Sequence, residues 1–493
     1  MSDYKNIEEF LLHVNKYSSN NSYFSENFSF DKLNIQNEIS LNFTSNLIRP
    51  KCSFAYTKES TKNQYVLGNG NYFKVENCIF QDNVTISIVN PNANIEFVNC
   101  TFKKKLVVKS TSSEDTNNIF SFILKGGEVD NLVIDGVIAN YKFYINPQNK
   151  TYKKSITIQN LQINDSKFIE NFKLHNTIIN NIEIEDVDFE KNADFFKSIF
   201  KKGLLEENDD EQTTLGDIGF KAINFRKLTL FGDTRFNKKL IFKYVTFEGH
   251  NHFKSSILEE GLDLEYTNIQ QEINFYGIHI IDTSRTSQET FRIIKHQFEK
   301  LGNKIEANKY HALELDKKRE NLKSEIDNEE KRINKSLFNI WLEYIVFQVH
   351  WLSSEHSTNW FLPLLWIPIV GITSSILAKP ADLTVTIQIM MLVLFLPILV
   401  SLILSLKLEK NMYVLMTILF GLSIFIFINS DIYIRDAIHY MSLIHLTTSE
   451  VIILGTIDDK LTIRQVFVLF LNKVSLGYLY YQFLMSVRKD TRK

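Results

Sequence analysis

Residues 240–247 read LIFKYVTF, and residues 262–269 read LDLEYTNI, so two octapeptides of one pattern begin 22 residues apart. In the first, the large apolar residues Phe242 and Phe247 stand five positions apart. A spacing of five fits neither the 3.6-residue period of an α-helix nor the two-residue period of a strand. Both side chains can point inward only if the chain turns a corner between them. The pattern therefore predicts short strands joined by corners.

The same pattern recurs along the first half of the chain, which indicates a repeat architecture. Six further copies are FKVENCIF (73–80), IEFVNCTF (95–102), ITIQNLQI (156–163), FKLHNTII (172–179), IEIEDVDF (182–189) and INFYGIHI (273–280). Intervals of 22 residues suit one full coil of a solenoid, which would place Cys78 over Cys100 as small packing residues in preference to redox or metal-binding groups. We expect an inward-facing solenoid core that includes Phe80, Phe102, Phe189, Phe247 and Ile269.

An apolar residue at every fifth position, with a small or β-branched residue two positions before it, resembles the sequences of pentapeptide-repeat proteins. The resemblance implies a mainly-β, right-handed quadrilateral β-helix over residues 70–283, interrupted at 109–131 and by the acidic insertion 201–216. Residues 1–69 would form an N-terminal cap region. The chain also resembles bacterial membrane proteins in which such repeats precede a C-terminal bundle of channel-like helices. That likeness implies architecture more than mechanism.

The last third of the chain differs from the rest in its long apolar runs. They lie near 360–378, 383–406, 411–434 and 461–487. At about 1.5 Å per residue, each run is long enough to cross a hydrocarbon core of about 30 Å as a helix, and several in close succession favour membrane spans over buried core helices. The sequence thus predicts an all-α multi-span membrane bundle over residues 355–493.

Basic residues beside these runs predict the topology. Lys407 and Lys410 follow the second run, and the last six residues, 488–493, read RKDTRK. With four spans, these charges and the N-terminal part all lie on the inner side, as the positive-inside rule requires. We therefore expect a multi-pass protein of the bacterial cytoplasmic (inner) membrane with both termini in the cytosol. Residues 437–457 fit a re-entrant half-helix, an interfacial helix or an extracytoplasmic cap.

A charged helical connector is expected over residues 284–335, between the repeats and the apolar runs. Its apolar residues follow a 3, 4, 3, 4 spacing, which predicts a helical seam made of Phe291, Ile294, Phe298, Leu301 and Ile305. The seam fits two interpretations equally, an oligomerising coil and a helix that caps the open end of the solenoid. Residues 336–354 then predict an amphipathic helix at a membrane interface.

Composition and motifs argue against catalysis and nucleic-acid binding. The 55 basic and 57 acidic residues give a net charge of −2, so no overall attraction to nucleic acid is expected. The three cysteines have no CxxC spacing, and no glycine-rich phosphate loop or nucleophile motif occurs. His250 and His252 form an HxH pair, interpreted as part of a loop in preference to a metal site. We expect no enzyme activity, no cofactor and no metal.

One charged residue is unusual in the last apolar run. Lys473, after Asn472, lies near the middle of 461–487, where a lysine costs about 2.5–3.5 kcal/mol to insert into a membrane. It predicts a pore-lining or gating charge, with Asp431 as a candidate partner. The alternative is a span that begins near Val474 and leaves Lys473 at the outer surface.

These features lead to two hypotheses of function. In the first, a cytosolic β-helix that senses or binds a partner is coupled to a pore or channel-like membrane domain, as in a stress or antiphage effector that permeabilises the membrane. In the second, the chain is a non-conducting, membrane-anchored protein-binding scaffold. The expected partners are membrane lipid, further copies of the chain in a homo-oligomer, and an unknown protein or ligand on the solenoid.

Overall fold

The computed structural model describes residues 28–31, 34–35, 39–44, 63–67, 72–77, 79–89, 93–110, 120–146, 155–204, 216–328, 336–378, 421, 438, 440–443 and 463–491. Contacts divide the chain into two compact units, Met1–Asn303 and Lys304–Lys493. The first unit contains the strands and helix α2, and the second contains the remaining helices.

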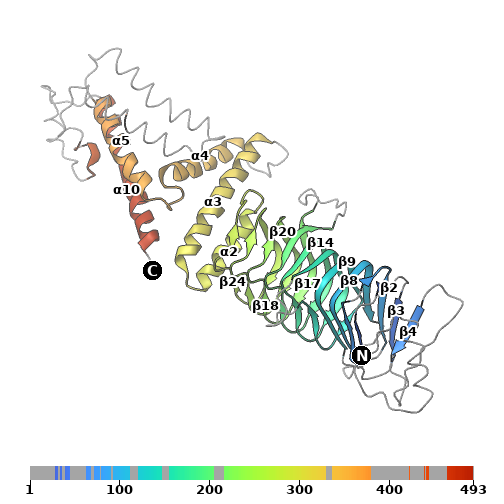
Figure 1. The fold of residues 1–493 in the computed structure, drawn as a ribbon. Helices are drawn as coiled ribbons and strands as arrows, with labels where there is room; N and C mark the ends of the chain where they lie inside the picture. The colour runs from blue at the N-terminus through green and yellow to red at the C-terminus, as the bar shows by residue number, and fades with distance from the viewer. Residues whose placement is uncertain are drawn as a thin grey trace, which may run out of the picture. The chain divides into compact units, whose positions relative to one another are not determined.

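The first unit is a β-solenoid, with its strands stacked in one column (Figure 1). Every strand pairing in the described part of the unit is parallel. The strands are β1 (Phe28–Asp31), β2 (Asn34–Ile35), β3 (Ile39–Thr44), β4 (Asn63–Leu67), β5 (Tyr72–Glu76), β6 (Ile79–Phe80), β7 (Val84–Val89), β8 (Ala93–Ser110), β9 (Phe120–Asp135), β10 (Ile138–Ala139), β11 (Phe143–Ile145), β12 (Ile156–Phe168), β13 (Phe172–Leu174), β14 (Thr177–Phe189), β15 (Ala193–Asp194), β16 (Ile199–Gly203), β17 (Ile218–Phe225), β18 (Thr229–Leu230), β19 (Arg235–Phe236), β20 (Leu240–Phe247), β21 (Asn251–His252), β22 (Ile257–Leu258), β23 (Leu262–Ile269), β24 (Ile273–Asn274) and β25 (His279–Ile280).

Strand register confirms the solenoid predicted from the repeat. Leu240 of β20 pairs with Leu262 of β23, 22 residues later, and Phe80 of β6 pairs with Phe102 of β8 at the same interval. Between β14 and β17 the interval rises to 36 residues, because Ile184 pairs with Phe220 across the acidic insertion. The predicted stacking of neighbouring coils is therefore present.

Corners between strands are made by residues with left-handed backbone. Tyr244 has φ 58°, and it lies between the buried residues Phe242 and Val245. A non-glycine residue rarely adopts this conformation, and here it turns the chain so that the residues on both sides face inward. The corner predicted from the five-residue spacing is confirmed.

Stacked phenylalanine rings fill the solenoid. Phe189, Phe225 and Phe247 form one column with ring centroids 5.1 and 5.3 Å apart and ring planes within 7° of each other. A second column joins Phe195, Phe231 and Phe253 at 4.8 and 4.7 Å. Of the predicted core residues, Phe80, Phe102, Phe189 and Phe247 are buried and Ile269 is half-buried. Cys100 is also buried, whereas Cys52 and Cys78 lie outside the described residues.

The solenoid extends beyond the limits expected from the repeat. Strands β1, β2 and β3, inside the expected cap region 1–69, pair with β5, β6 and β7. Strand β9 continues the sheet through most of the expected interruption at 109–131. Gly127 of β9 faces Cys100, and a Cβ there would lie 2.0 Å from the Cys100 carbonyl oxygen, so glycine is required at that close approach.

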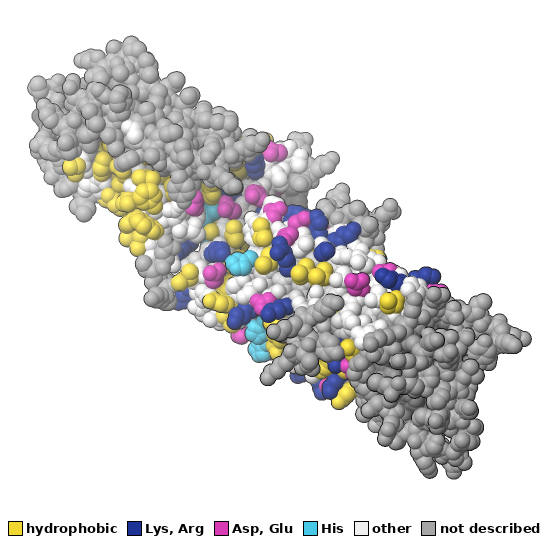
Figure 2. All heavy atoms as spheres, in the orientation of Figure 1, with side chains coloured by type: hydrophobic (Ala, Val, Ile, Leu, Met, Phe, Trp, Pro, Cys, Tyr) yellow, Lys and Arg dark blue, Asp and Glu magenta, His cyan; other side chains and the backbone are white. Residues whose placement is uncertain are grey.

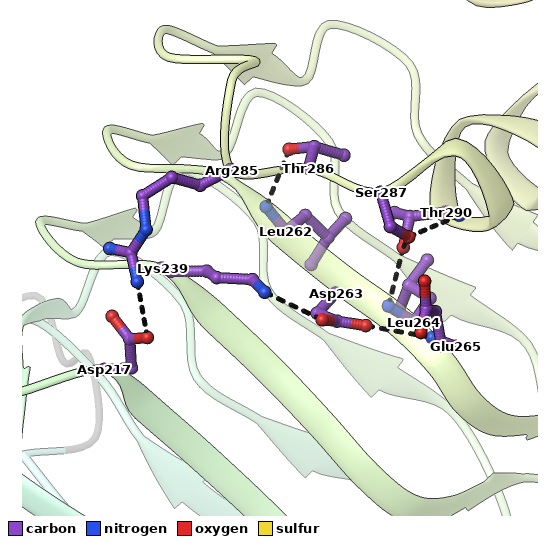
Figure 3. Close-up of polar contacts among 10 residues, drawn as sticks. All are labelled: Asp217, Lys239, Leu262, Asp263, Leu264, Glu265, Arg285, Thr286, Ser287 and Thr290. Carbon is purple, nitrogen blue, oxygen red and sulfur yellow. Dashed lines mark hydrogen bonds and ion pairs between the residues drawn. The ribbon is translucent and has the colours of Figure 1, made fainter. Parts of the chain in front are cut away.

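Helix α2 (Gln288–Lys300) covers the last coil. Its residues Phe291, Ile294 and Phe298 are buried, while Leu301, the residue that ends the helix, is 42% exposed. Ile305 belongs to the next helix, α3 (Lys304–Asp327), and is 50% exposed. Backbone N–H groups of the last coil, which no further coil accepts, donate instead to side chains of the cap. Leu262 donates to Thr286 and Leu264 to Thr290 (Figure 3), and Ile273 donates to Gln297. Of the two interpretations of the connector seam, α2 therefore has the geometry of a cap.

The second unit is helical. It contains α3 (Lys304–Asp327), α4 (Leu337–Ser354), α5 (Phe361–Ala378) and α10 (Ile463–Thr491). Helix α3 packs on α4 around Leu322, Ile340 and Tyr344. Helix α5 packs on α10 around Leu362, Trp366, Ile367, Ile369, Leu476 and Leu479.

The predicted all-α multi-span membrane bundle is wrong. Among the helices in the described ranges, none is long and apolar enough to cross a membrane. The predicted spans 360–378 and 461–487 correspond to α5, which has 18 residues and an internal Pro368, and to α10, which buries the polar residues Asn472, Gln482 and Ser486. The spans at 383–406 and 411–434 lie, apart from Gly421, outside the described residues, as does most of 437–457.

The predictions that depend on membrane spans are therefore also wrong. A pore or channel-like membrane domain, a membrane-anchored scaffold, and a multi-pass location in the bacterial inner membrane all required helices that cross a bilayer. The expectation rested on runs without charged residues, and it gave too little weight to the proline, serine, asparagine and glutamine within them.

Candidate functional site

The turn between α4 and α5 has an unusual backbone. Glu355, His356 and Ser357 have φ values of 45°, 58° and 64°, the one run of three non-glycine residues with positive φ in the described chain. Each such residue costs about 1–2 kcal/mol relative to its ordinary conformation. Strain of this kind persists only where surrounding contacts hold it, and it concentrates at functional sites. The turn is therefore a candidate functional site.

Hydrogen bonds at the end of α4 fix the turn. The backbone N–H of Glu355 donates to the carbonyl oxygen of Trp351 at 2.7 Å, and that of Ser357 donates to Oγ of Ser354 at 3.0 Å. Helix α10 supplies two more contacts: Gln482 Oε1 accepts from the hydroxyls of Ser354 and Ser357 at 3.0 and 2.8 Å. The turn is thus tied to a helix more than a hundred residues away in sequence.

Two histidines meet at this turn. Nδ1 of His350, in the last turns of α4, lies 2.8 Å from Nδ1 of His356, and the ring centroids are 4.9 Å apart. His356 is fully buried and its Nε2 lies 3.5 Å from Oδ1 of Asp316 on α3, while Nε2 of His350 lies 3.4 Å from Oγ of Ser357. The four groups form a chain from a carboxylate through two imidazoles to a hydroxyl, here called the histidine relay.

The short Nδ1 to Nδ1 distance restricts the protons of the histidine relay. Neutral imidazole has one N–H donor and one acceptor nitrogen, so one of the two Nδ1 atoms must carry a hydrogen and the other must not. A consistent assignment gives His356 its proton on Nε2, facing Asp316, and gives His350 its proton on Nδ1. Both rings are then neutral, and Nε2 of His350 carries no hydrogen and lies 3.4 Å from Oγ of Ser357.

Cationic groups surround the histidine relay. Arg319 of α3 is 3.1 Å from Asp316, donates to Gln348 Oε1 at 3.1 Å, and lies 4.5 Å over the Trp351 ring. Lys489 of α10 donates to the carbonyl oxygen of His356 at 3.3 Å. Burial lowers the pKa of Lys489.

The pKa of His350 is lowered to about 4, first by burial and then by His356, Lys489 and His311. His311 in turn lies 3.3 Å from the buried carboxylate of Glu314. The neutral form of His350 is therefore favoured in the fold.

The relay is not arranged for nucleophilic catalysis. Ser357 is 4% exposed, and its hydroxyl is 2.8 Å from Gln482 Oε1 but 3.4 Å from His350, so its hydrogen is directed to the amide. What the geometry can do is hold one proton between two imidazoles.

The residues predicted for a pore lie elsewhere in the second unit. Lys473 donates from Nζ to the carbonyl oxygen of Ser442, and burial lowers its pKa. Asn472 is 2% exposed, and neither its carboxamide nitrogen nor its oxygen has a hydrogen-bond partner among the described residues. Asp431 lies outside the described residues, so the predicted pairing with Lys473 is untested.

The HxH pair lies on the outer surface of the solenoid. His250 is exposed and His252 is half-buried, with Asn251 pointing inward between them. No group of three or more histidine, cysteine, aspartate or glutamate residues placed to bind a metal occurs in the described ranges. No family model matches the chain, and no curated protein or solved structure is similar to it.

Proposed function

We propose that the chain is a non-catalytic, proton-responsive β-solenoid protein whose helical unit changes conformation when the histidine relay takes up a second proton. The observation that carries this proposal is the 2.8 Å separation between Nδ1 of His350 and Nδ1 of His356. Histidine is the side chain whose charge ordinarily changes between pH 5 and 8, and buried histidine pairs suit acid-sensitive switches.

A second proton is incompatible with the observed contact. If both imidazoles were charged, two N–H groups would face each other at 2.8 Å and two positive charges would lie side by side. The pair must then separate. His356 is within the strained turn and His350 is on α4, so separation frees the turn to leave its left-handed conformation.

Charged groups from two helices and from the turn surround the pair. Helix α3 presents Arg319 and His311 with the carboxylates Asp316 and Glu314, α10 presents Lys489, and the turn itself carries Glu355. Burial, and then His356, Lys489 and His311, disfavour a charged His350. His350 is therefore neutral in the fold at neutral pH.

Hydrogen exchange of the full-length chain at several pH values tests this proposal. After correction for intrinsic exchange rates, the amides of residues 351–359 should lose protection as pH falls from 7 toward 5, because the turn opens when the pair separates. His350→Gln, which cannot be charged, should remove this pH dependence. His296→Gln, at an exposed histidine of α2, is the matched control. Equal pH dependence in wild type and His350→Gln would contradict the proposal.

We also propose that the solenoid is a degenerate member of the pentapeptide-repeat class and is right-handed. Support comes from inward-facing residues five apart, such as Phe242 and Phe247, with a corner residue between them. Its outer faces bind an unknown protein or ligand in this proposal, and no nucleic acid is expected because basic side chains such as Lys221 and Arg226 are paired with carboxylates.

A further inference from the structure

One side of α10 carries an unbroken row of seven residues that repeats every seven positions. The row, here called the α10 seam, follows a 4, 3, 4, 3, 4, 3 spacing and consists of Ile463, Phe467, Phe470, Val474, Gly477, Tyr481 and Leu484. Six of its members are large and hydrophobic, and they are between 55% and 91% exposed. Figure 2 shows hydrophobic side chains gathered over the region of α5 and α10.

The α10 seam is not the face that packs inside the unit. Leu476 and Leu479 are buried against α5, and Gln482 and Ser486 are buried at the turn that precedes α5. The large side chains of the seam are exposed, and no described residue covers them. Exposed phenylalanine and tyrosine in a continuous row mark an interaction surface.

The spacing of the α10 seam identifies the kind of partner. A straight helix has 3.6 residues per turn, so a strict seven-residue repeat drifts around it by about 20° per heptad unless the helix supercoils with another helix. A lipid surface or an irregular protein surface imposes no such repeat. Apolar residues repeated at this spacing over three successive heptads are typical of the contacting face of a coiled coil.

Two further details keep the α10 seam free for a close helix partner. Gly477 lies in the row with no atom within 4 Å of the position a Cβ would occupy. The one charged side chain beside the middle of the row, Lys473, has its Nζ directed to the carbonyl oxygen of Ser442 within the same chain. The row is therefore uncharged along its whole length and open at its centre.

We propose that the α10 seam binds the same seam of a second copy of this chain, forming a coiled coil between subunits. This proposal is independent of the histidine relay, because none of the four relay residues is on α10. Association buries Phe467, Phe470 and Val474 as knobs between the two helices. Exposed rows of this size are otherwise unfavourable in water.

The molar mass of the full-length chain, measured by light scattering after size exclusion at several concentrations, tests this proposal. Wild type should show a multiple of 57.6 kDa. Phe470→Glu and Val474→Glu should each reduce the mass to that of one chain, because a charge would be buried in the seam. Tyr244→Glu, at a tyrosine 66% exposed on the solenoid, should leave the mass unchanged.

A cross-linking measurement guards against variants that fail to fold. In a background with Cys52 and Cys78 changed to serine and Cys100 to alanine, Val474→Cys should form a disulfide-linked dimer under mild oxidation. Ser475→Cys, one position off the seam, should not. A wild-type chain that stays monomeric, equal linking at both positions, or association only on adding phosphatidylcholine vesicles would overturn the proposal.

Discussion

Oε1 of Gln297 accepts a hydrogen bond of 3.0 Å from the backbone N–H of Ile273. In earlier described coils the equivalent N–H donates to a carbonyl oxygen of the next coil, as Asn251 does to Glu272 and Thr229 does to His250. Helix α2 therefore presents side-chain oxygens at the positions where a further coil would present backbone oxygens. This substitution ends the sheet without leaving buried N–H groups unpaired.

Removing these acceptors should destabilise the solenoid. Gln297→Leu and Thr290→Val each leave a buried backbone N–H without a partner, which costs about 1–3 kcal/mol. Urea unfolding followed by far-ultraviolet circular dichroism would measure the loss. Thr246→Val, on the outer face of β20, is the control and should change stability little. Unchanged unfolding midpoints for both cap variants would show that α2 is not needed to end the sheet.

The effects on stability of replacing the two residues of the buried ion pair beside the cap should not be additive. Nζ of Lys239 lies 2.8 Å from Oδ2 of Asp263, and both residues are buried (Figure 3). Lys239→Met alone leaves an unpaired buried carboxylate and should cost about 3–5 kcal/mol. The double variant Lys239→Met, Asp263→Leu should recover most of that loss. A double-mutant cycle by urea unfolding measures the coupling, and strictly additive effects would rule out a buried pair.

Replacing Phe231 tests how much the stacked phenylalanine rings stabilise the solenoid. Its ring lies between Phe195 and Phe253 in the column and is fully buried, so Phe231→Ala should cost about 3–5 kcal/mol. Tyr276→Ala removes a ring that is 59% exposed and should cost much less. Thermal unfolding by circular dichroism compares the two. Equal losses would mean that the column contributes no more than a surface ring.

The sequence predicts the solenoid well because its signal is local. Phe242 and Phe247 are separated by a fixed number of residues, and the corner at Tyr244 follows from that spacing. Strand β9 was missed because Gly126 and Gly127 replace the usual residues at its corner, which removes the pattern although the pairing continues.

The histidine relay could not be predicted from the sequence. His350 and His356 are six positions apart and meet only because the intervening chain leaves the helix through a left-handed turn. Asp316 and Lys489 arrive from helices distant in sequence, so no spacing links them. The apolar runs predict spans wrongly because the absence of charged residues does not show which face of a helix its polar residues occupy.

Replacing the first residue of the strained turn with glycine should not destabilise the helical unit. Glu355 has φ 45°, a conformation that glycine adopts without penalty, so Glu355→Gly should stabilise the helical unit or leave it unchanged despite losing the contact with Asn359. Glu355→Val should destabilise it by more than 1 kcal/mol, about the cost of left-handed backbone for a β-branched residue. Tryptophan fluorescence reports on this unit alone, since all four tryptophans of the chain, Trp341, Trp351, Trp360 and Trp366, lie in it. Equal stability of the glycine and valine variants would show that the turn is not strained.

The stability of the helical unit should fall in mild acid. The pKa of His350 is lowered to about 4 in the folded chain, against an ordinary value of 6.5. Between these two pH values His350 is protonated in the unfolded chain but not in the folded chain. The free energy of unfolding therefore decreases as pH falls from 6.5 toward 4. Above pH 6.5, the contribution of His350 to the free energy of unfolding is fully present.

The free energy of unfolding changes by at most about 1.4 kcal/mol per pH unit for one proton. The change is smaller here because His350 is only partly buried. Urea unfolding followed by tryptophan fluorescence at pH 7.5 and pH 5 measures the change. In His350→Gln the part of the pH dependence that comes from this proton should vanish, while His296→Gln should keep it. If the glutamine variant lost stability in acid as steeply as wild type, the loss would come from other groups and not from His350.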